Sequence, residues 1–267
     1  MRNLLLKIQY DGSLYHGWAR QPGLKTVCGR MEEVLSEYFS MPIELAGASR
    51  TDAGVHANGQ AATLVTELGV PVEKIPAVFN TALADDRMEG LSDIRVLGAW
   101  EMPEGFHARF DSKGKRYIYR IRNSETPDIF LKRYRWQITR PLDIEAMRAA
   151  CPYVEGEHDF ACFQSSGSPA ASTVREVYSL DVRRLEDDPQ EIVLTIEGSA
   201  FLYNMVRIIT GTLVETGLGK RQPEDMERII ASKDRSNAGI IAPAGGLWLD
   251  EVFYQERQHG TEQTRMG

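Results

Sequence analysis

Residues 47–60 read GASRTDAGVHANGQ, a stretch rich in glycine and alanine between two predicted strands, at residues 43–48 and 60–66. Small residues in such a connection let another backbone or a ligand approach closely. Hydrophobic periodicity on either side predicts the remaining elements of this part of the chain. They are strands over residues 4–10 and 94–100 and helices over residues 27–39 and 72–83. The resulting β-α-β-β-α-β order is typical of a ferredoxin-like unit.

The rest of the chain repeats this alternation of strands and helices. The predicted strands cover residues 115–122, 134–138, 173–185, 191–197 and 247–254, and the predicted helices cover residues 144–153, 201–216 and 224–231. We therefore predict an α+β protein of two ferredoxin-like (RRM-like) halves, with antiparallel sheets packed around a central active-site cleft. The predicted domains are residues 1–105 and 106–254, followed by a polar tail, residues 255–267, that we expect to be disordered.

The composition is that of an ordinary globular protein, with 42% hydrophobic and 26% charged residues in a chain of 267. No stretch approaches the roughly 20 apolar residues of a membrane span, and the apolar run near the start is too short for a signal peptide. Cys28, Cys151 and Cys162 lack CxxC spacing. This pattern argues against a disulfide framework or a zinc site and favours a location in the reducing cytoplasm.

Two basic strips stand out in a chain whose formal net charge is −7. The first holds Lys113, Lys115, Arg116, Arg120 and Arg122, the second holds Lys132, Arg133, Arg135 and Arg140, and the aromatic residues Tyr117, Tyr119, Tyr134 and Trp136 lie among them. One interpretation is a solvated strand face. The other is an aromatic, basic surface that binds the phosphates and bases of a nucleic acid.

Asp52 is the acidic residue of the opening stretch. An aspartate in a glycine-rich loop commonly forms a turn through its own side chain. A metal site would need further carboxylates or histidines at ligand spacing, which the surrounding sequence lacks. Asp52 alone therefore leaves a turn and a catalytic role both open.

Arg207 lies in the apolar run FLYNMVRIITG of residues 201–211, whose pattern predicts a largely buried helix. An arginine cannot lose its proton, so in such a helix it needs an anion or a path to solvent. A structural ion pair would satisfy it. A functional carboxylate would too, and Arg207 would lower the pKa of that carboxylate and keep it ionised. An ionised aspartate in a partly apolar pocket is a candidate nucleophile.

Tyr117 and Tyr119 alternate with Ile118, which places both tyrosines on one face of the predicted strand. They are either half-buried strand residues or a platform on which a flipped-out base stacks.

Five stretches occur in one order along the chain. They are YDG and GW (residues 10–12 and 17–18), GASRTDAGVHA (47–57), HARF with KRY (107–110 and 115–117), FLYNMVR (201–207) and APAGGLWL (242–249). Together they resemble the motifs of the TruA family of tRNA pseudouridine synthases, over about residues 4–254. Ala19 and Cys28 depart from the pattern, which commonly has Gln at both positions.

The resemblance implies an enzyme that isomerises uridine to pseudouridine at positions 38, 39 and 40, in the anticodon stem-loop of tRNA. The N1–C1′ bond breaks, the base rotates, and the ribose rejoins it through C5. The family needs no cofactor and no metal, and it acts as a homodimer with tRNA lying across both subunits.

The resemblance also implies catalytic roles. Asp52 is the nucleophile, attacking C1′ or C6 or removing the ribose 2′ proton in a glycal route. Arg207 pairs with Asp52 and keeps it charged. Tyr117 stacks on the flipped uracil and is a candidate relay for the C5 proton.

Three further residues are expected at the substrate. Arg50 fills the gap that the flipped base leaves in the stem. Leu249 supplies an apolar wall. His56 stands at a substrate-binding position of the motif, although a structural role is the interpretation we favour for it.

Two other classes of protein compete with this reading. A non-catalytic RNA-binding protein with two RRM-like halves would carry RNP-type patterns, which are absent from this sequence, and gives no reason for Arg207 in an apolar helix. A ferredoxin-like enzyme for small molecules, with Asp52 as general base, leaves the basic strips and Tyr117 unexplained.

Overall fold

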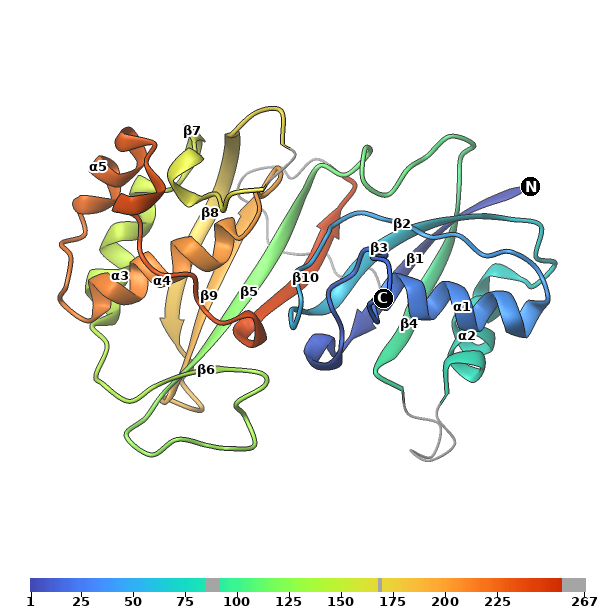
Figure 1. Cartoon of the computed structure of the whole chain (residues 1–267), viewed down its shortest axis with the longest axis horizontal. Helices are drawn as coiled ribbons and strands as arrows, with labels where there is room; N and C mark the ends of the chain where they lie inside the picture. The colour runs from blue at the N-terminus through green and yellow to red at the C-terminus, as the bar shows by residue number, and fades with distance from the viewer. Residues whose placement is uncertain (85–91, 168–169, 256–267) are drawn as a thin grey trace.

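The computed structural model describes residues 1–84, 92–167 and 170–255. Two halves, each of strands and helices, lie side by side along the longest axis of the molecule (Figure 1). The first half contains β1 (Arg2–Tyr10), α1 (Val27–Phe39), β2 (Ala46–Gly47), β3 (His56–Thr66), α2 (Ile75–Leu83) and β4 (Ile94–Met102). The second contains β5 (Gly114–Asn123), β6 (Trp136–Ile138), α3 (Ile144–Ala150), β7 (Gly156–Asp159), β8 (Val174–Arg184), β9 (Glu191–Gly198), α4 (Met205–Gly217), α5 (Asp225–Ser232) and β10 (Leu247–Phe253).

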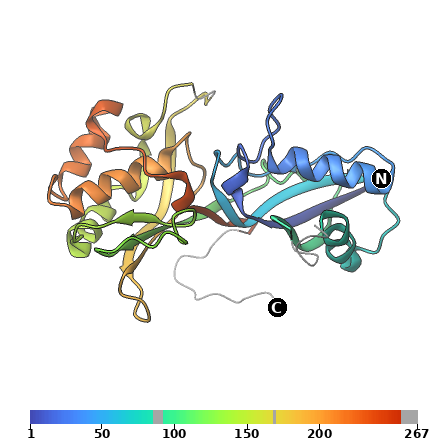
Figure 2. The same ribbon diagram turned by 60° about the horizontal axis from the view of Figure 1, so that its bottom comes forward.

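Helix α1 has the predicted bounds because its two ends carry clear signals. The Thr26 side chain accepts a hydrogen bond from the Gly29 N–H, which satisfies one of the free donors of the first turn. Ser40 ends the helix in the left-handed conformation, with φ 53°. Val27, Met31 and Leu35 recur at helical spacing and are buried. They hold α1 along one face of the strands of the first half (Figure 2).

The strands form one continuous sheet. Among the described residues, ten strands follow the order β4-β1-β3-β10-β5-β9-β8-β7, with β2 beside β3 and β6 beside β5. Neighbours are antiparallel in β4-β1-β3-β2 and again in β10-β5-β9-β8. β10 pairs in parallel with β3, through Trp248 with His56 and Leu249 with Ala57. The α+β class is confirmed, whereas the two expected sheets are joined edge to edge by β10 instead of standing apart.

Several predicted elements have different bounds in the structure, and one strand was not predicted. Helix α4 begins at Met205 and not at residue 201, because Asn204 adopts a left-handed conformation with φ 61° that a helix cannot continue. The strand predicted over residues 43–48 is reduced to the two residues of β2. Strand β7 was not predicted, since its four residues, GEHD, carry no apolar alternation. Residues 256–267, nearly all of the predicted tail, lie outside the described residues.

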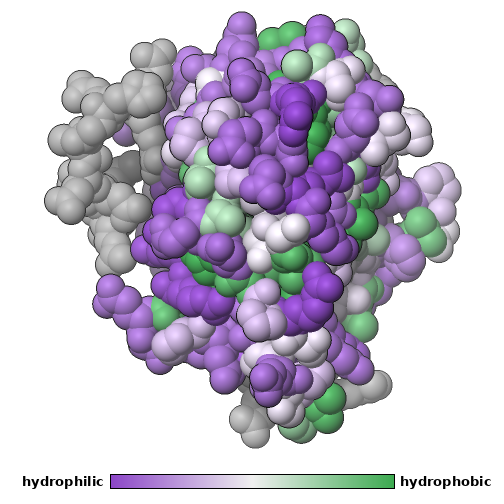
Figure 3. Space-filling model, turned by 90° about the vertical axis from the view of Figure 1, so that its left-hand side faces the viewer, coloured by the Kyte–Doolittle hydropathy of each residue, from purple (hydrophilic) through white to green (hydrophobic). Residues whose placement is uncertain are grey.

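The apolar core runs through both halves as one large cluster, which includes residues of β1, α1, β5, β9 and α4. At the end of the molecule formed by the second half, hydrophilic side chains surround smaller hydrophobic areas (Figure 3). Surfaces of folded proteins commonly have this mixture. In the described part of the chain, no helix is both long enough and apolar enough to span a bilayer.

Candidate active site

The loop that carries Asp52 is packed against the turn that follows β1. The Trp18 N–H donates to the Thr51 carbonyl (3.1 Å), and the Gly54 N–H donates to the Tyr15 carbonyl (3.2 Å). A Cβ atom on Gly12 would lie 1.9 Å from the carbonyl oxygen of Val55, so only glycine permits this approach. Gly12, in the turn after β1, therefore allows the two loops to lie against each other.

Asp52 and Arg207 meet although 155 residues separate them in the chain. The Arg207 Nη1 donates to Asp52 Oδ2 at 3.3 Å. The Asp52 side chain is 23% exposed and the Arg207 side chain is 17% exposed, so the pair is sheltered but still open to solvent. Arg207 belongs to the second half and Asp52 to the first, which places the pair between the two halves.

Two further contacts fix the Arg207 guanidinium. Its Nε donates to the Ala242 carbonyl (2.7 Å), and its Nη1 also donates to Asn204 Oδ1 (2.7 Å). The chain near Ala242 lies close to α4 because Gly211 has no side chain, and a Cβ there would be 1.9 Å from the carbonyl oxygen of Ile240. Arg207 is thus held in place by three acceptors, of which Asp52 is the only charged one.

The pKa of Asp52 reflects two opposing influences. Burial raises it above the ordinary aspartate value, while the charge and the hydrogen bond of Arg207 lower it to a smaller extent. The net direction is upward and so opposite to the expected lowering. Arg207 limits this rise, because without it only the effect of burial would remain.

Tyr117 lies in β5 and is almost fully buried. Its hydroxyl shares a hydrogen bond of 2.7 Å with Ser49 Oγ, three residues before Asp52. Its ring meets the Phe201 ring edge-on, with centroids 5.2 Å apart. Burial raises the pKa of Tyr117 to about 12, with a further contribution from the charge of Asp52, so the phenol is neutral at physiological pH.

Ser49, which sequence reasoning missed, is itself held by Gln60. The fully buried Gln60 side chain accepts from the Ser49 N–H (3.2 Å) and donates to the Ser49 carbonyl (2.8 Å). Asn204, also missed, donates to Ser165 Oγ (2.9 Å) while it accepts from Arg207. Asn204 directly precedes an apolar helix, and asparagine is one of the residues that tolerate a left-handed backbone. Its position in the sequence therefore indicated a special role at the start of this helix.

His56 is fully buried, with no exposed surface for a substrate. Its Nδ1 accepts from the Gly12 N–H (3.1 Å), and its Nε2 donates to the Arg133 carbonyl (3.0 Å). The ring stacks on Trp248 at 4.4 Å. Asp11 lies 3.2 Å from Nδ1 and accepts from the Tyr134 hydroxyl (2.7 Å). These contacts tie the start of β3 to both halves, as the structural interpretation of His56 requires.

Leu249 and Arg50 occupy opposite environments. Leu249 is fully buried in β10, where it pairs with Tyr117 on one side and Ala57 on the other. Arg50 is exposed and forms no ion pair or side-chain hydrogen bond with the described residues. Leu249 thus lies beside Tyr117 in the sheet without exposed surface, while Arg50 is an exposed cation two residues before Asp52.

The site brings three functional groups of the chain together. The described residues contain no group of three or more histidines, cysteines, aspartates or glutamates that would hold a metal ion. The three cysteines are buried and unpaired. The arrangement offers a sheltered carboxylate, a cation fixed against it and a neutral phenol, which suit covalent or proton-transfer chemistry on a base stacked nearby.

Comparison with known proteins decides the family. A model described as tRNA pseudouridine synthase matches residues 7–111 and 150–255. The chain belongs to the tRNA pseudouridine synthase family. It is 42% identical over 254 residues to "tRNA pseudouridine synthase A" of Acetivibrio thermocellus, across 95% of this chain and 100% of that protein. The "tRNA pseudouridine synthase A 2" of Clostridium perfringens is 38% identical, with the same coverage. The resemblance to TruA is confirmed, and the chain is an isomerase that forms pseudouridine from uridine in tRNA.

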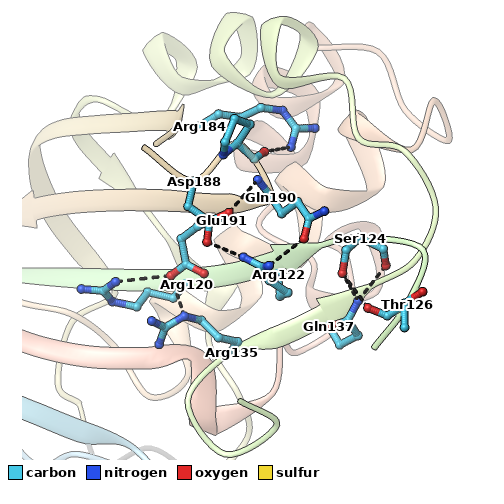
Figure 4. A network of polar contacts seen from close by, with 11 residues as sticks. Arg120, Arg122, Ser124, Thr126, Arg135, Gln137, Arg184, Asp188, Gln190 and Glu191 are labelled. Atoms are coloured by element: carbon cyan, nitrogen blue, oxygen red, sulfur yellow. Dashed lines mark hydrogen bonds and ion pairs between the residues drawn. The ribbon is translucent and has the colours of Figure 1, made fainter. Parts of the chain in front are cut away.

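All three arginines of the first basic strip form ion pairs within this synthase. Arg116 binds Glu197 (2.7 Å), Asp250 and Glu251 (both 3.1 Å). Figure 4 shows the neighbouring network, in which the almost fully buried Glu191 pairs with Arg120 and Arg135, and Asp188 pairs with Arg122. All three arginines of β5 are even-numbered and share the face opposite Tyr117. The strip is therefore largely a set of ion pairs, and most of its charge is not free for RNA.

Proposed function

We propose that this synthase acts on uridines 38, 39 and 40 in the anticodon stem-loop of tRNA, with Asp52 as the nucleophile. The observation that carries the mechanism is the Asp52–Arg207 pair, formed between two halves of the chain. Tyr117 lies close enough for the charge of Asp52 to raise its pKa. The target positions are those of the TruA family, which the chain resembles over nearly its whole length.

In the proposed reaction the Asp52 carboxylate attacks C1′ of the ribose or C6 of the uracil, or removes the ribose 2′ proton. The N1–C1′ bond breaks, the base rotates, and a C5–C1′ bond forms. Asp52 is released when its bond to C1′ or C6 breaks or, in the glycal route, when it returns the proton to C2′. The proton on C5 is then lost and N1 gains one. Arg207 fixes the carboxylate and counters the effect of burial on its pKa. A lower pKa leaves a larger fraction of Asp52 ionised and able to react.

The remaining residues hold the nucleotide. Tyr117 stacks on the flipped uracil against the wall formed by Leu249, and its neutral hydroxyl relays the C5 proton through the bond to Ser49. The exposed Arg50 enters the stem where the base has left, since a planar guanidinium can stack in that gap. His56 keeps the catalytic loop in position without contacting the substrate.

We also propose that residues 1–105 and 106–254 are two ferredoxin-like units. The antiparallel order β4-β1-β3-β2 of the first unit recurs as β10-β5-β9-β8 in the second, which supports this division. The enzyme would act in the cytoplasm as a homodimer, with one tRNA lying across both subunits.

Release of tritium from tRNA labelled with [5-³H]uridine tests the reaction, because pseudouridine formation frees the C5 hydrogen. Transcripts with single uridines at positions 38, 39 or 40 locate the target. The Asp52→Asn variant should release no tritium and still bind tRNA, whereas Asp188→Asn, a control distant from the site, should react like the wild type. Turnover by Asp52→Asn would refute the nucleophile, and tRNA binding by a wild type that releases no tritium would favour a binding protein.

A further inference from the structure

Lys115 differs from the other basic residues of β5 in having no acidic partner. Its side chain is only 7% exposed, and its Nζ contacts Ser112 Oγ at 3.4 Å. Within the described ranges it forms no ion pair with a carboxylate. Being odd-numbered, it lies on the Tyr117 face of the strand and not among the paired arginines. A buried cation without a counterion is costly for a folded protein and calls for an explanation.

Two arginines from other elements converge on Lys115. Strand register aligns Lys115 with Gly198 of β9 and Gly198 with Val177 of β8, and Arg175 lies two residues further along β8. Arg109 is exposed in the loop between β4 and β5, and its carbonyl accepts a hydrogen bond (3.1 Å) from the Ser112 Oγ that Lys115 Nζ contacts. Burial, together with the charges of Arg109 and Arg175, lowers the pKa of Lys115 to about 8.

No carboxylate of the described chain forms an ion pair with this cluster. The Arg175 Nη1 donates to the carbonyls of Ser172 and Val174, while its Nε is buried without a partner among the described residues. Asp111, in the same loop as Arg109, accepts instead from the His107 N–H. Lys115, Arg175 at the end of β8 and Arg109 in the preceding loop thus form a cluster of cations without an anion among the described residues, which is the arrangement expected of an anion-binding site before its ligand arrives.

The position of the cluster identifies the anion. Lys115 and Tyr117 are two residues apart on one strand face, a separation of about 6.8 Å. The Phe201 ring lies over Gly198 on one side and meets the Tyr117 ring on the other. We propose that Arg109, Lys115 and Arg175 bind a backbone phosphate of tRNA next to the target uridine. This inference rests on the proposed function, in which the uracil stacks on Tyr117.

Substituting Lys115→Met tests the site, because methionine keeps the length and removes the charge. Each phosphate contact contributes about 0.7 to the slope of log K against log salt for single strands. Losing one phosphate contact should therefore make the slope for an unmodified tRNA transcript less steep by about 0.7 and weaken binding about fivefold at 0.1 M salt. The variant should also melt at the same or a higher temperature than the wild type, since it removes an uncompensated buried charge.

The control is Arg122→Gln, which removes an equal charge from the opposite face of β5. Asp188 neutralises Arg122 in the wild type, so this variant should leave the salt slope unchanged. Arg175→Gln is the second test and should lower the slope as Lys115→Met does. Unchanged tRNA affinity in both variants would overturn the site. So would weaker binding accompanied by a lower melting temperature in both, because that result marks a structural role.

Pseudouridine formation by the wild type separates this inference from the proposed function. If the wild type modifies uridines 38–40 while Lys115→Met and Arg175→Gln bind tRNA normally, only the phosphate site fails. If the wild type modifies none of these uridines while both variants lose affinity and salt dependence, the cluster still binds RNA and the proposed target is wrong.

Discussion

Replacing Arg207 with Gln tests whether this arginine sets the protonation of Asp52. The two charged groups are 3.3 Å apart, which at an effective dielectric constant of 20 corresponds to an attraction of about 5 kcal/mol. Both side chains are partly exposed, so water screens part of it. A close opposite charge typically lowers the pKa of an aspartate by about 1–3 units, or roughly 1.4–4 kcal/mol. We therefore expect Arg207→Gln to raise the pKa of Asp52 by that amount.

The assay is the pH dependence of kcat/KM, measured by tritium release from labelled tRNA. Asp52 must be ionised to react, so activity rises with pH through the pKa of this group. In Arg207→Gln the acidic limb of the profile should move up by about 1–3 pH units, and activity should partly recover at high pH. A limb at the wild-type position would show that Arg207 does not act on Asp52 electrostatically.

Arg207→Lys is the matched variant that keeps the charge. A single ammonium group cannot reproduce the three contacts that the guanidinium makes with Asp52, Asn204 and Ala242. The acidic limb should stay near its wild-type position while the plateau falls sharply, which separates positioning from charge. A plateau equal to that of the wild type would exclude the positioning role.

Three further substitutions probe the site. The pKa of Asp52 is raised in the folded state, so ionisation of Asp52 destabilises the fold, and the stability present below the ordinary aspartate pKa is lost as pH rises through the raised value. The Asp52→Asn variant should lack this loss of stability in urea titrations at pH 4 to 8. An unchanged pH dependence of its stability would contradict the raised pKa. Tyr117→Phe keeps the stacking ring and loses the bond to Ser49, so KM should change little while kcat falls about tenfold or more; an unchanged kcat would exclude a role for the hydroxyl. His56→Ala leaves the Gly12 N–H and the Arg133 carbonyl without partners, and it should cost about 3 kcal/mol in urea unfolding; a loss below about 1 kcal/mol would refute the anchoring role.

Local signals made much of the fold predictable. The helix of residues 27–39 has its predicted bounds because a threonine cap and an apolar stripe both lie within the segment itself. The start of α4 was misplaced because Phe201 and Leu202 are apolar for a different reason: Phe201 packs against Tyr117, and Leu202 is buried in the core. Apolar character reports burial, and the left-handed Asn204 decides where the helix begins.

The residues of the candidate site were predictable from the sequence, but the pKa of Asp52 and the ion pairs of the basic residues were not. That Arg207 needs an anion follows from its apolar neighbours, and Asp52 is that anion. The rise in the pKa of Asp52 depends on how deeply the loop is buried, which no local pattern specifies. Likewise, whether a basic residue of β5 is neutralised depends on strand register, since the carboxylate partners Glu191 and Glu197 lie about 70 to 80 residues away.

The parallel pairing of β10 with β3 has a consequence for the timing of activity during synthesis. β10 follows every other described strand in the chain, and it is the strand that links β3 to β5. Until the ribosome has released residues 247–253, the loop of Asp52 and the strand of Tyr117 have no shared sheet to align them. The nascent chain is therefore expected to remain inactive on tRNA until β10 is in place, even if its first half has already folded.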